Sequence, residues 1–311
     1  MSAVRFRPKP LPQQNGALTS SGRRFAWCRR RQFAAPRASR LAPRTVADVL
    51  RAIEAAMPLR AGTTTTVDRI IVGNAEVPLT GIITTMFPTM GVLREAVARR
   101  ANLLVVHEPT FYQASDDVSA LDGDPVYAEK RAFIERHGLV IFRNHDRIHA
   151  CDPDGVRFGI VEALGWGAAF NPTVPRIVDI APTSLGDIMA MVAQRLDAPN
   201  LHYIGDPTML VRRMHISPGY NSFRSVLPVW REHNPDLLIA GEIFEWEAAE
   251  YFRDAVALGH RKAVLFTGHS VSEEPGSAWM ATWLKAIAPT TPIHHIPRGE
   301  PVARFPSASG R

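Results

Sequence analysis

Cysteine is scarce in this sequence, whose 311 residues include only Cys28 and Cys151. Because the two lie far apart and share no metal-type spacing, we expect neither a disulfide framework nor a cysteine zinc site. So little cysteine fits a reducing compartment, and we expect a cytoplasmic protein. Long hydrophobic runs are also missing. No stretch of about 18 apolar residues occurs, so we expect no membrane span and no membrane partner.

Acidic residues are absent from positions 1–44, which hold ten arginines and Lys9. Of the 36 basic residues in the chain, the 25 outside this tail face 30 acidic ones, which gives positions 45–311 a net charge of −5. The overall charge of +6 therefore comes from the tail. Nucleic-acid binding by the folded body is not expected from such a balance.

The basic tail 1–44 is rich in Pro, Ser and Gln and has no apolar periodicity, so we predict that it is disordered. Arg37 and Arg40 interrupt the apolar stretch that a twin-arginine export signal needs after its arginines. Two interpretations of the tail remain open. It is an organelle transit peptide, or it is an upstream extension from a misassigned start codon.

Helical and strand periodicities alternate along the rest of the chain. Thr45, with Asp48 three residues later, predicts a capped helix at "TVADVLRAIEAAM", and Thr89 caps another at "GVLREAVARRA". Apolar strands such as "LLVV" and "DLLIA" separate the helices. The pattern favours an α/β protein, or α+β with mixed sheets. We expect two pseudo-related α/β halves, residues 45–175 and 176–311, with a site in the cleft between them.

Three apolar strands end in residue types that bind metals. In open α/β sheets, ligands bind beyond the carboxyl ends of the strands. Imidazole suits borderline metals such as Zn and Fe, and a carboxylate can bridge two ions. Repetition at three strand ends indicates a metal site more strongly than any one residue does. The residues concerned are His107 and Glu108, then His145, Asp146 and His149, and then His269 and Glu273.

Each of these residues also has an ordinary structural explanation. His145 and His149, four residues apart, share a face if the segment is helical, or else flank a turn. Ser272 is a candidate cap for a helix over about 276–287, which makes Glu273 a first-turn acid favoured by the helix dipole. Glu242, just after a strand, is either a helix-start acid or a pocket residue.

The stretch "GIITTMFPTMGVLREAVARRANLLVVHEPTFY" resembles the NGG-interacting-factor-three family. Its members are also called dinuclear-metal-centre hexameric proteins or GTP cyclohydrolase type-two homologues. "TGHSVSEEPG" matches the family's C-terminal Gly-His-x3-Glu, and "HDRIH" occupies its middle motif. The resemblance covers about residues 45–300. Glu108 replaces the second His of the family's His-His-Pro, and His149 replaces an Asp, which indicates a divergent subgroup with a HEPTFY signature.

The resemblance implies two divalent metal ions, Zn, Fe or Mn, and a ring-shaped homo-hexamer. Two adjacent ions need a bridging carboxylate, and Glu273 is the natural candidate. Glu108 is either a substituted ligand or an acid that orients an imidazole. The ligands that we predict on this basis are His107, Glu108, His149, His269 and Glu273. The residues that we predict to support or orient them are His145, Asp146 and Glu242.

A pair of metals with an activated water predicts a metal-dependent hydrolase of an unknown small-molecule substrate. No other catalytic residue is indicated. One alternative is a non-catalytic metal-binding regulator or scaffold, because ligands alone do not establish turnover. A minor alternative is a serine hydrolase with Ser270 as nucleophile, since "GHSVS" approaches the G-x-S-x-G elbow. Only 41 residues follow Ser270, which leaves little room for the later triad members.

Overall fold

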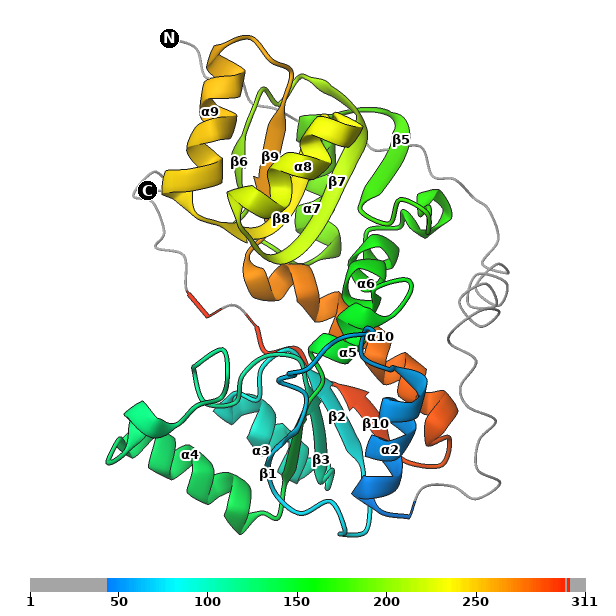
Figure 1. Ribbon diagram of the computed structural model, residues 1–311, viewed down its shortest axis with the longest axis vertical. Coiled ribbons are helices and arrows are strands. Elements are labelled where there is room, and N and C mark those ends of the chain that lie inside the picture. Colours follow the sequence, from blue (N-terminus) through cyan, green and yellow to red (C-terminus); the bar gives the residue numbers. More distant parts are fainter. Residues whose placement is uncertain (1–43, 300, 303–311) are drawn as a thin grey trace, which may run out of the picture.

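The computed structural model describes residues 44–299, 301 and 302 (Figure 1). Apart from Arg44, the basic tail predicted to be disordered lies outside the described residues. Within the described part of the chain, no helix is both long enough and apolar enough to cross a membrane.

The first sheet has three parallel central strands. β2, β3 and β4 run parallel, β10 adds a parallel edge beside β2, and β1 pairs antiparallel with β4. Its spatial order is β1 (Ile70–Val72), β4 (Val140–Arg143), β3 (Leu103–Val106), β2 (Ile82–Thr85) and β10 (Ile293–His295). The predicted strand "LLVV" is thus the middle strand.

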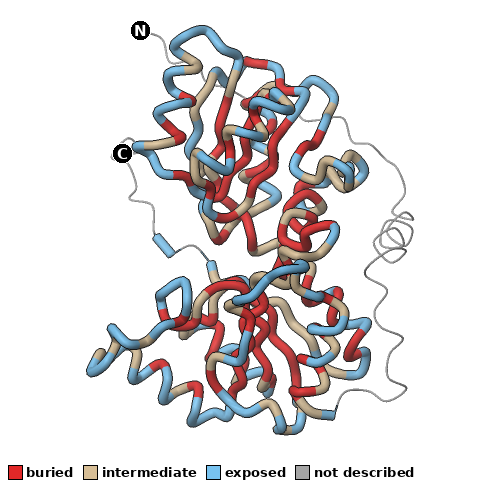
Figure 2. The backbone as a smooth tube through the Cα atoms, in the orientation of Figure 1, coloured by how far each residue is buried: buried red, intermediate tan, exposed pale blue. Residues whose placement is uncertain are grey.

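Helices cover both faces of this sheet, which explains why all four residues of β3 are apolar and buried. Leu103 and Val105 belong to one buried cluster with α2 (Val46–Ala56) and α10 (His269–Ile287). Leu104 and Val106 belong to another with α3 (Met90–Ala98) and α4 (Pro125–Arg136). Figure 2 shows the buried strands between more exposed helices.

The second sheet repeats the parallel centre but has antiparallel edges on both sides. Here β7, β8 and β9 run parallel, while β5 and β6 are antiparallel to their neighbours. The order is β5 (Ile177–Ser184), β7 (Leu210–Asn221), β8 (Leu237–Ile243), β9 (Ala263–Phe266) and β6 (His202–Ile204). The predicted α/β class with mixed sheets is confirmed.

Helices also cover both faces of the second sheet. One buried cluster joins it to α6 (Gly155–Ala163) and α7 (Leu185–Arg195). A second cluster on the opposite face joins it to α8 (Phe223–His233) and α9 (Glu250–Ala257). The remaining short elements are η1 (Ser119–Leu121), α5 (Asp146–Ala150), η2 (Gly167–Ala169) and the π-helix η3 (Glu245–Ala249).

Two predicted helix starts are confirmed. The Thr45 side chain accepts a hydrogen bond from Asp48 N, and the Asp48 carboxylate accepts one from Thr45 N. The two bonds complete a capping box on α2. Thr89 caps α3 through Val92 N. The predicted cap at Ser272 is wrong, because α10 begins at His269 after Gly268. His269 and Glu273 therefore lie one turn apart on a helix.

Helix α10 connects the two sheets (Figure 1). It starts just after β9 of the second sheet, and its later residues Trp283, Leu284 and Ile287 pack in a core cluster of the first. Strand β10, which follows, lies at the edge of the first sheet. Strands β1 to β4 of the first sheet precede the strands of the second along the chain, and β10 returns to the first.

Candidate metal centre

Strand β3 places His107 and Glu108 at its carboxyl end. His107 N donates to Thr85 O and Glu108 N donates to Met86 O, at 3.2 and 2.9 Å, so both backbones stay attached to the neighbouring strand. Their side chains are buried, with residue exposures of 4% and 8%. The strand thus holds an imidazole and a carboxylate rigidly at its end.

Helix α5 presents His145 and His149 from the end of β4. The segment is helical, so the two imidazoles share a face, with ring centroids 5.0 Å apart. The His107 ring stacks on His145 at 4.6 Å and lies 5.1 Å from His149. Buried Asp68 accepts from the backbone N–H groups of the first turn, at 2.8 to 2.9 Å, which fixes the start of this short helix.

Helix α10 adds His269 and Glu273 to the same place. His269 Nε2 lies 3.0 Å from Glu108 Oε1 and 3.2 Å from Glu273 Oε2. Glu273 Oε2 also lies 3.4 Å from His107 Nε2. One carboxylate oxygen therefore stands between two imidazoles from different parts of the chain, as expected of a bridging ligand.

Gly219 of strand β7, in the second sheet, packs against the Glu273 side chain. This glycine has φ +69°, and a Cβ there would stand 2.2 Å from Glu273 Oε1, so a larger residue would have to displace the carboxylate. Gly219 N donates to Ser272 Oγ at 2.9 Å, and Ser272 donates to His269 O at 2.6 Å. The β7 backbone thereby locks the first turn of α10.

Three of the four histidines have a carboxylate beside their Nδ1 atom. Asp146 Oδ1 lies 2.9 Å from His145 Nδ1, and Glu242 Oε1 lies 3.1 Å from His269 Nδ1. Asp154 Oδ2, which sequence reasoning missed, lies 3.0 Å from His149 Nδ1. A carboxylate on one ring nitrogen orients an imidazole and leaves the other nitrogen for a metal.

Asp154 carried a recognisable signal in the sequence, since it precedes the predicted helix "FGIVEALGW". Its side chain caps α6 through Val156 N and Arg157 N. Burial by itself would raise the pKa of Asp154, but His149 and Arg157 beside it hold the pKa at about 2. The same carboxylate thus starts a helix and orients an imidazole.

The carboxylates and imidazoles of the cluster stabilise one another's charged forms. Burial opposes ionisation of Glu273, but His107 and His269 hold its pKa far below the usual range. Burial would lower the pKa of His269, yet the carboxylates of Glu108 and Glu273, 3.0 and 3.2 Å from its Nε2, raise it to about 11. Likewise the pKa of His107 is raised against burial, chiefly by Glu273. Positive charge is therefore stabilised here.

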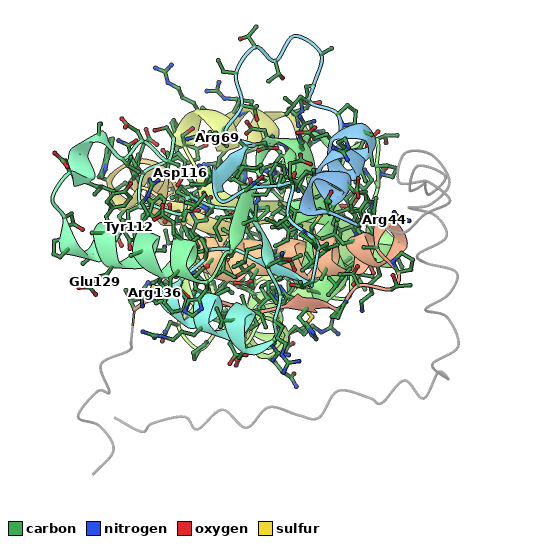
Figure 3. The ribbon with its side chains drawn as sticks, turned by 90° about the horizontal axis from the view of Figure 1, so that it is seen from below. Arg44, Arg69, Tyr112, Asp116, Glu129 and Arg136 are labelled. Atoms are coloured by element: carbon green, nitrogen blue, oxygen red, sulfur yellow. The ribbon has the colours of Figure 1, made fainter. Side chains whose placement is uncertain are left out.

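Arg143, which sequence reasoning also missed, holds the outer oxygen of Glu108. Its Nη2 donates to Glu108 Oε2 at 3.2 Å, and its Nη1 donates to Asp116 Oδ2 at 3.1 Å. Asp116, labelled in Figure 3, lies in the loop between β3 and α4. Glu108 therefore turns Oε1 toward His269 while Oε2 is anchored, a geometry that suits a ligand with one coordinating oxygen.

The residues of this cluster fit a cation. Within the described residues, two groups have ligand atoms within 4.8 Å of one another, and both contain His107. They are His107, His145 and His149, and His107, Glu108 and Glu273. Neither ring nitrogen of His107 has a hydrogen-bond partner among the described residues, nor has Glu273 Oε2. Buried polar atoms without hydrogen-bond partners are rare, and here they face one another as imidazole nitrogens and a carboxylate oxygen, which suits a shared cation.

The structure thus brings together all five predicted ligands, at the carboxyl ends of strands from both sheets. It also places all three predicted supporting residues beside them. Ser270, the alternative nucleophile, behaves differently. Its hydroxyl contacts Arg298 Nε, and no described imidazole lies within hydrogen-bonding distance of it. Among the described residues, the hydrogen bond of the Ser270 hydroxyl is thus to an arginine and not to an imidazole.

Comparisons with known proteins identify relatives of this chain. Residues 44–297 match the family described as Duf34/NIF3 (NGG1p interacting factor 3). A Clostridium acetobutylicum protein called GTP cyclohydrolase 1 type 2 homolog is 20% identical over 227 residues, covering 70% of this chain and 80% of that protein.

Two solved structures have a similar fold. A Staphylococcus aureus protein superposes with a TM-score of 0.67 at 13% identity, covering 85% of this chain and 99% of its own. A Bacillus cereus protein related to NIF3 superposes with a TM-score of 0.66 at 14% identity, covering 85% of this chain and 100% of its own. With a family match that spans most of its length and a fold shared with a NIF3-related protein, this chain belongs to the Duf34/NIF3 family.

Proposed function

We propose that the chain binds two divalent metal ions at this centre and hydrolyses a small-molecule substrate there. The observation that carries the proposal is the position of His107. It belongs to both groups of ligand atoms, and both of its buried ring nitrogens lack hydrogen-bond partners among the described residues. Because a neutral imidazole ligates one ion through one nitrogen, His107 can belong to only one of two adjacent sets, and the neighbouring Glu and His residues would hold the second ion.

Glu273 is the residue best placed to serve both sets. Its Oε2 lies between His107 Nε2 and His269 Nε2, and its Oε1 faces Gly219. His145 and His149 would complete one set, and Glu108 and His269 the other. Two such ions would supply Lewis acidity and lower the pKa of a water molecule toward neutrality.

The surrounding residues keep the ligands in place and leave one side open. Asp146, Asp154 and Glu242 orient the imidazoles through Nδ1. The side chain of Glu242 is 55% exposed, and it also lines a cavity of about 740 Å³ together with Gly268. That volume suits a small-molecule substrate, and we assign substrate entry to this side.

The experiment counts metal ions and then looks for turnover. Protein purified without chelator is expected to contain two equivalents of metal, and His107→Ala and Glu273→Ala to lose both. Metal-loaded protein is then assayed on phosphoester, amide and nucleotide substrates, since the clostridial relative is named for a reaction on GTP. Unchanged metal content in both variants would refute the site.

Metal without turnover would favour the non-catalytic alternative. If the loaded protein hydrolyses no substrate with Zn, Fe or Mn, while both alanine variants lose the metal, the centre binds metal as a regulator or scaffold. Turnover that Glu273→Ala abolishes, while circular dichroism shows that the variant remains folded, would establish the hydrolase.

A further inference from the structure

Three aromatic side chains form an exposed cluster at the carboxyl end of the second sheet. Tyr220 lies near the end of β7, Phe244 directly follows β8, and Trp246 lies in η3. These residues are 48%, 45% and 73% exposed. The Phe244 ring lies 5.2 Å from that of Tyr220 and stacks on that of Trp246 at 5.3 Å. Single exposed apolar residues are ordinary, but a contiguous group of large rings is typical of a binding surface. We call these three residues the aromatic platform.

The aromatic platform adjoins the metal centre at Glu242. In the parallel register Tyr220 pairs with Glu242, so their side chains point to the same face of the sheet. Phe244 has an extended backbone and comes two residues after Glu242, a spacing that returns to the same face. Glu242 Oε1 lies 3.1 Å from His269 Nδ1. The carboxylate that orients a proposed metal ligand is therefore the neighbour of both Tyr220 and Phe244.

The backbone that carries the platform is fixed on both strands. Gly219, directly before Tyr220, donates from its N–H to Ser272 Oγ at 2.9 Å. After β8, Glu247 of η3 accepts from Phe223 N at 2.9 Å. A π-helix such as η3 is rare, and such helices occur frequently at functional sites. The rings are thus held in place without a ligand, which lowers the cost of binding one.

The occupant that fits the platform is part of a small molecule. An aromatic side chain has about 150–250 Å² of surface, so three partly exposed rings offer well under the about 800 Å² that each partner buries in a stable protein interface. Glu242 and Glu245, on either side of Phe244 in the sequence, line the 740 Å³ cavity to which we assign substrate entry. A molecule with one end at the metal centre can therefore extend past Glu242 onto the rings.

We propose that the substrate of the metal centre carries an aromatic ring, which stacks on the aromatic platform while the reacting group faces the metal ligands. Stacking of a planar ring on such side chains adds affinity beyond the burial of apolar area. The platform thereby selects among molecules that the centre could otherwise bind equally. This inference rests on the proposed function, because it takes the metal centre as the place of reaction.

Three phosphonates separate the platform from the metal centre. Ethylphosphonate, 2-cyclohexylethylphosphonate and 2-phenylethylphosphonate share one phosphoryl group that binds divalent metals, and they contain no ester bond to hydrolyse. The two-carbon linker lets the ring pass Glu242, since neighbouring strands lie about 4.8 Å apart. Calorimetry on the metal-loaded full chain should show 2-phenylethylphosphonate binding about tenfold more tightly than ethylphosphonate and about threefold more tightly than the cyclohexyl probe, which has no π face.

Matched variants locate the ring. Phe244→Leu and Tyr220→Leu should each weaken 2-phenylethylphosphonate about fivefold, because each removes one stacking face. Both should keep the wild-type metal content and the wild-type affinity for ethylphosphonate. Tyr203→Leu is the control, since Tyr203 is 47% exposed but lies on β6, at the edge of the same sheet. It should bind all three probes like the wild type.

The outcomes distinguish this inference from the proposed function. Equal affinity for the phenyl and ethyl probes, or for the phenyl and cyclohexyl probes, would overturn the platform while the metal centre stands. Wild-type affinity in both Phe244→Leu and Tyr220→Leu would do the same. A change in sedimentation in Phe244→Leu with unchanged affinity would instead assign the rings to a contact between copies of the chain. Protein that holds no metal, or that holds metal and binds none of the probes, would refute the proposed function and this inference with it.

Discussion

Each sheet contains a fully buried histidine, and the two have opposite surroundings. His107 follows β3 in the first sheet, and His215 lies within β7 in the second. Neither imidazole has a hydrogen-bond partner among the described residues. Burial lowers the pKa of both, but Glu273 and Glu108 raise that of His107 above its usual value. At His215, burial together with Arg176 and Arg157 lowers the pKa to about 3.

The comparison shows that burial alone does not make a metal ligand. His215 is surrounded by cations and is a neutral side chain in the interior. His107 is surrounded by carboxylates and imidazoles that attract positive charge. A divalent ion therefore gains from the neighbours of His107 and would be repelled by those of His215. The charge of the neighbours, rather than depth, distinguishes a candidate ligand from a structural residue.

The largest expected effect is a difference in metal content between two matched variants. His107→Leu should lose both ions, because it removes one ligand of the first set and also the imidazole that faces the shared carboxylate of Glu273 across 3.4 Å. His215→Leu should keep both. Elemental analysis of the two purified proteins checks this directly. Equal metal content in the two variants would mean that the contrast between the two histidines has no bearing on metal binding.

The pH dependence of stability should reveal the neutral state of His215. Its folded pKa of about 3 lies below the ordinary 6.5, so the unfolded chain binds a proton that the folded chain does not. Stability is therefore unaffected above pH 6.5 and falls as pH drops below it, by about 2 kcal/mol at pH 5. Urea unfolding of wild type and His215→Leu at pH 7.5 and 5 measures the difference.

His215→Leu should lose about 2 kcal/mol less than wild type over that pH interval, because it lacks the imidazole. Chelator in both samples removes any contribution from bound metal. Parallel losses in the two proteins would show that His215 titrates normally and is accessible to protons.

Gly219→Ala tests whether the second sheet shapes the centre. Gly219 and Gly123 both have positive φ, +69° and +75°, so alanine costs about 1–2 kcal/mol at either position. Only at Gly219 does the new Cβ meet a group of the centre, the Glu273 carboxylate, while Gly123 has open space. Gly219→Ala should therefore reduce metal content as well as stability, and Gly123→Ala stability alone. A fully metal-loaded Gly219→Ala would contradict this.

Glu242→Gln should have the smallest effect, a loss of metal affinity of about tenfold. Glu242 orients His269 through Nδ1, but its side chain is 55% exposed and water can replace it in part. Competition titration with a chromogenic chelator measures the change. Glu245→Gln, at a residue that lines the same 740 Å³ cavity, is the control and should keep wild-type affinity. Equal losses of affinity in both variants would mean that negative charge near the site matters, and not the orientation of His269 by Glu242.

Local features of the fold could be predicted because they depend on neighbours in sequence. Thr45 was predicted as a cap from Asp48 three positions later, and Thr89 from the apolar helical pattern that follows it. The start of α10 was placed too late, since the helix was expected over about 276–287 and begins at His269. In the structure Gly276 instead lies closely against Val156 of α6, so tertiary packing retains a residue of low helix propensity within the helix.

The candidate ligands could be predicted by residue type and by resemblance, but their partners could not. Asp154 and Arg143 carry no motif that connects them to His149 and Glu108. The hexameric assembly and the substrate stay predictions. The domain division at residue 175 also stays a prediction, although the position of β10 shows that the last residues pack with the first sheet.

The sequence by itself determined the alternation of strands and helices, the caps, and the strand ends that carry imidazoles and carboxylates, because periodicity and capping are local. Only the tertiary structure decided that Glu108 Oε1 faces His269, 161 residues away, while Arg143 anchors Oε2. It also decided that His107 is enclosed by acids and His215 by arginines. These relations depend on how α10 packs between two sheets, and such long-range packing leaves no periodic pattern along the chain.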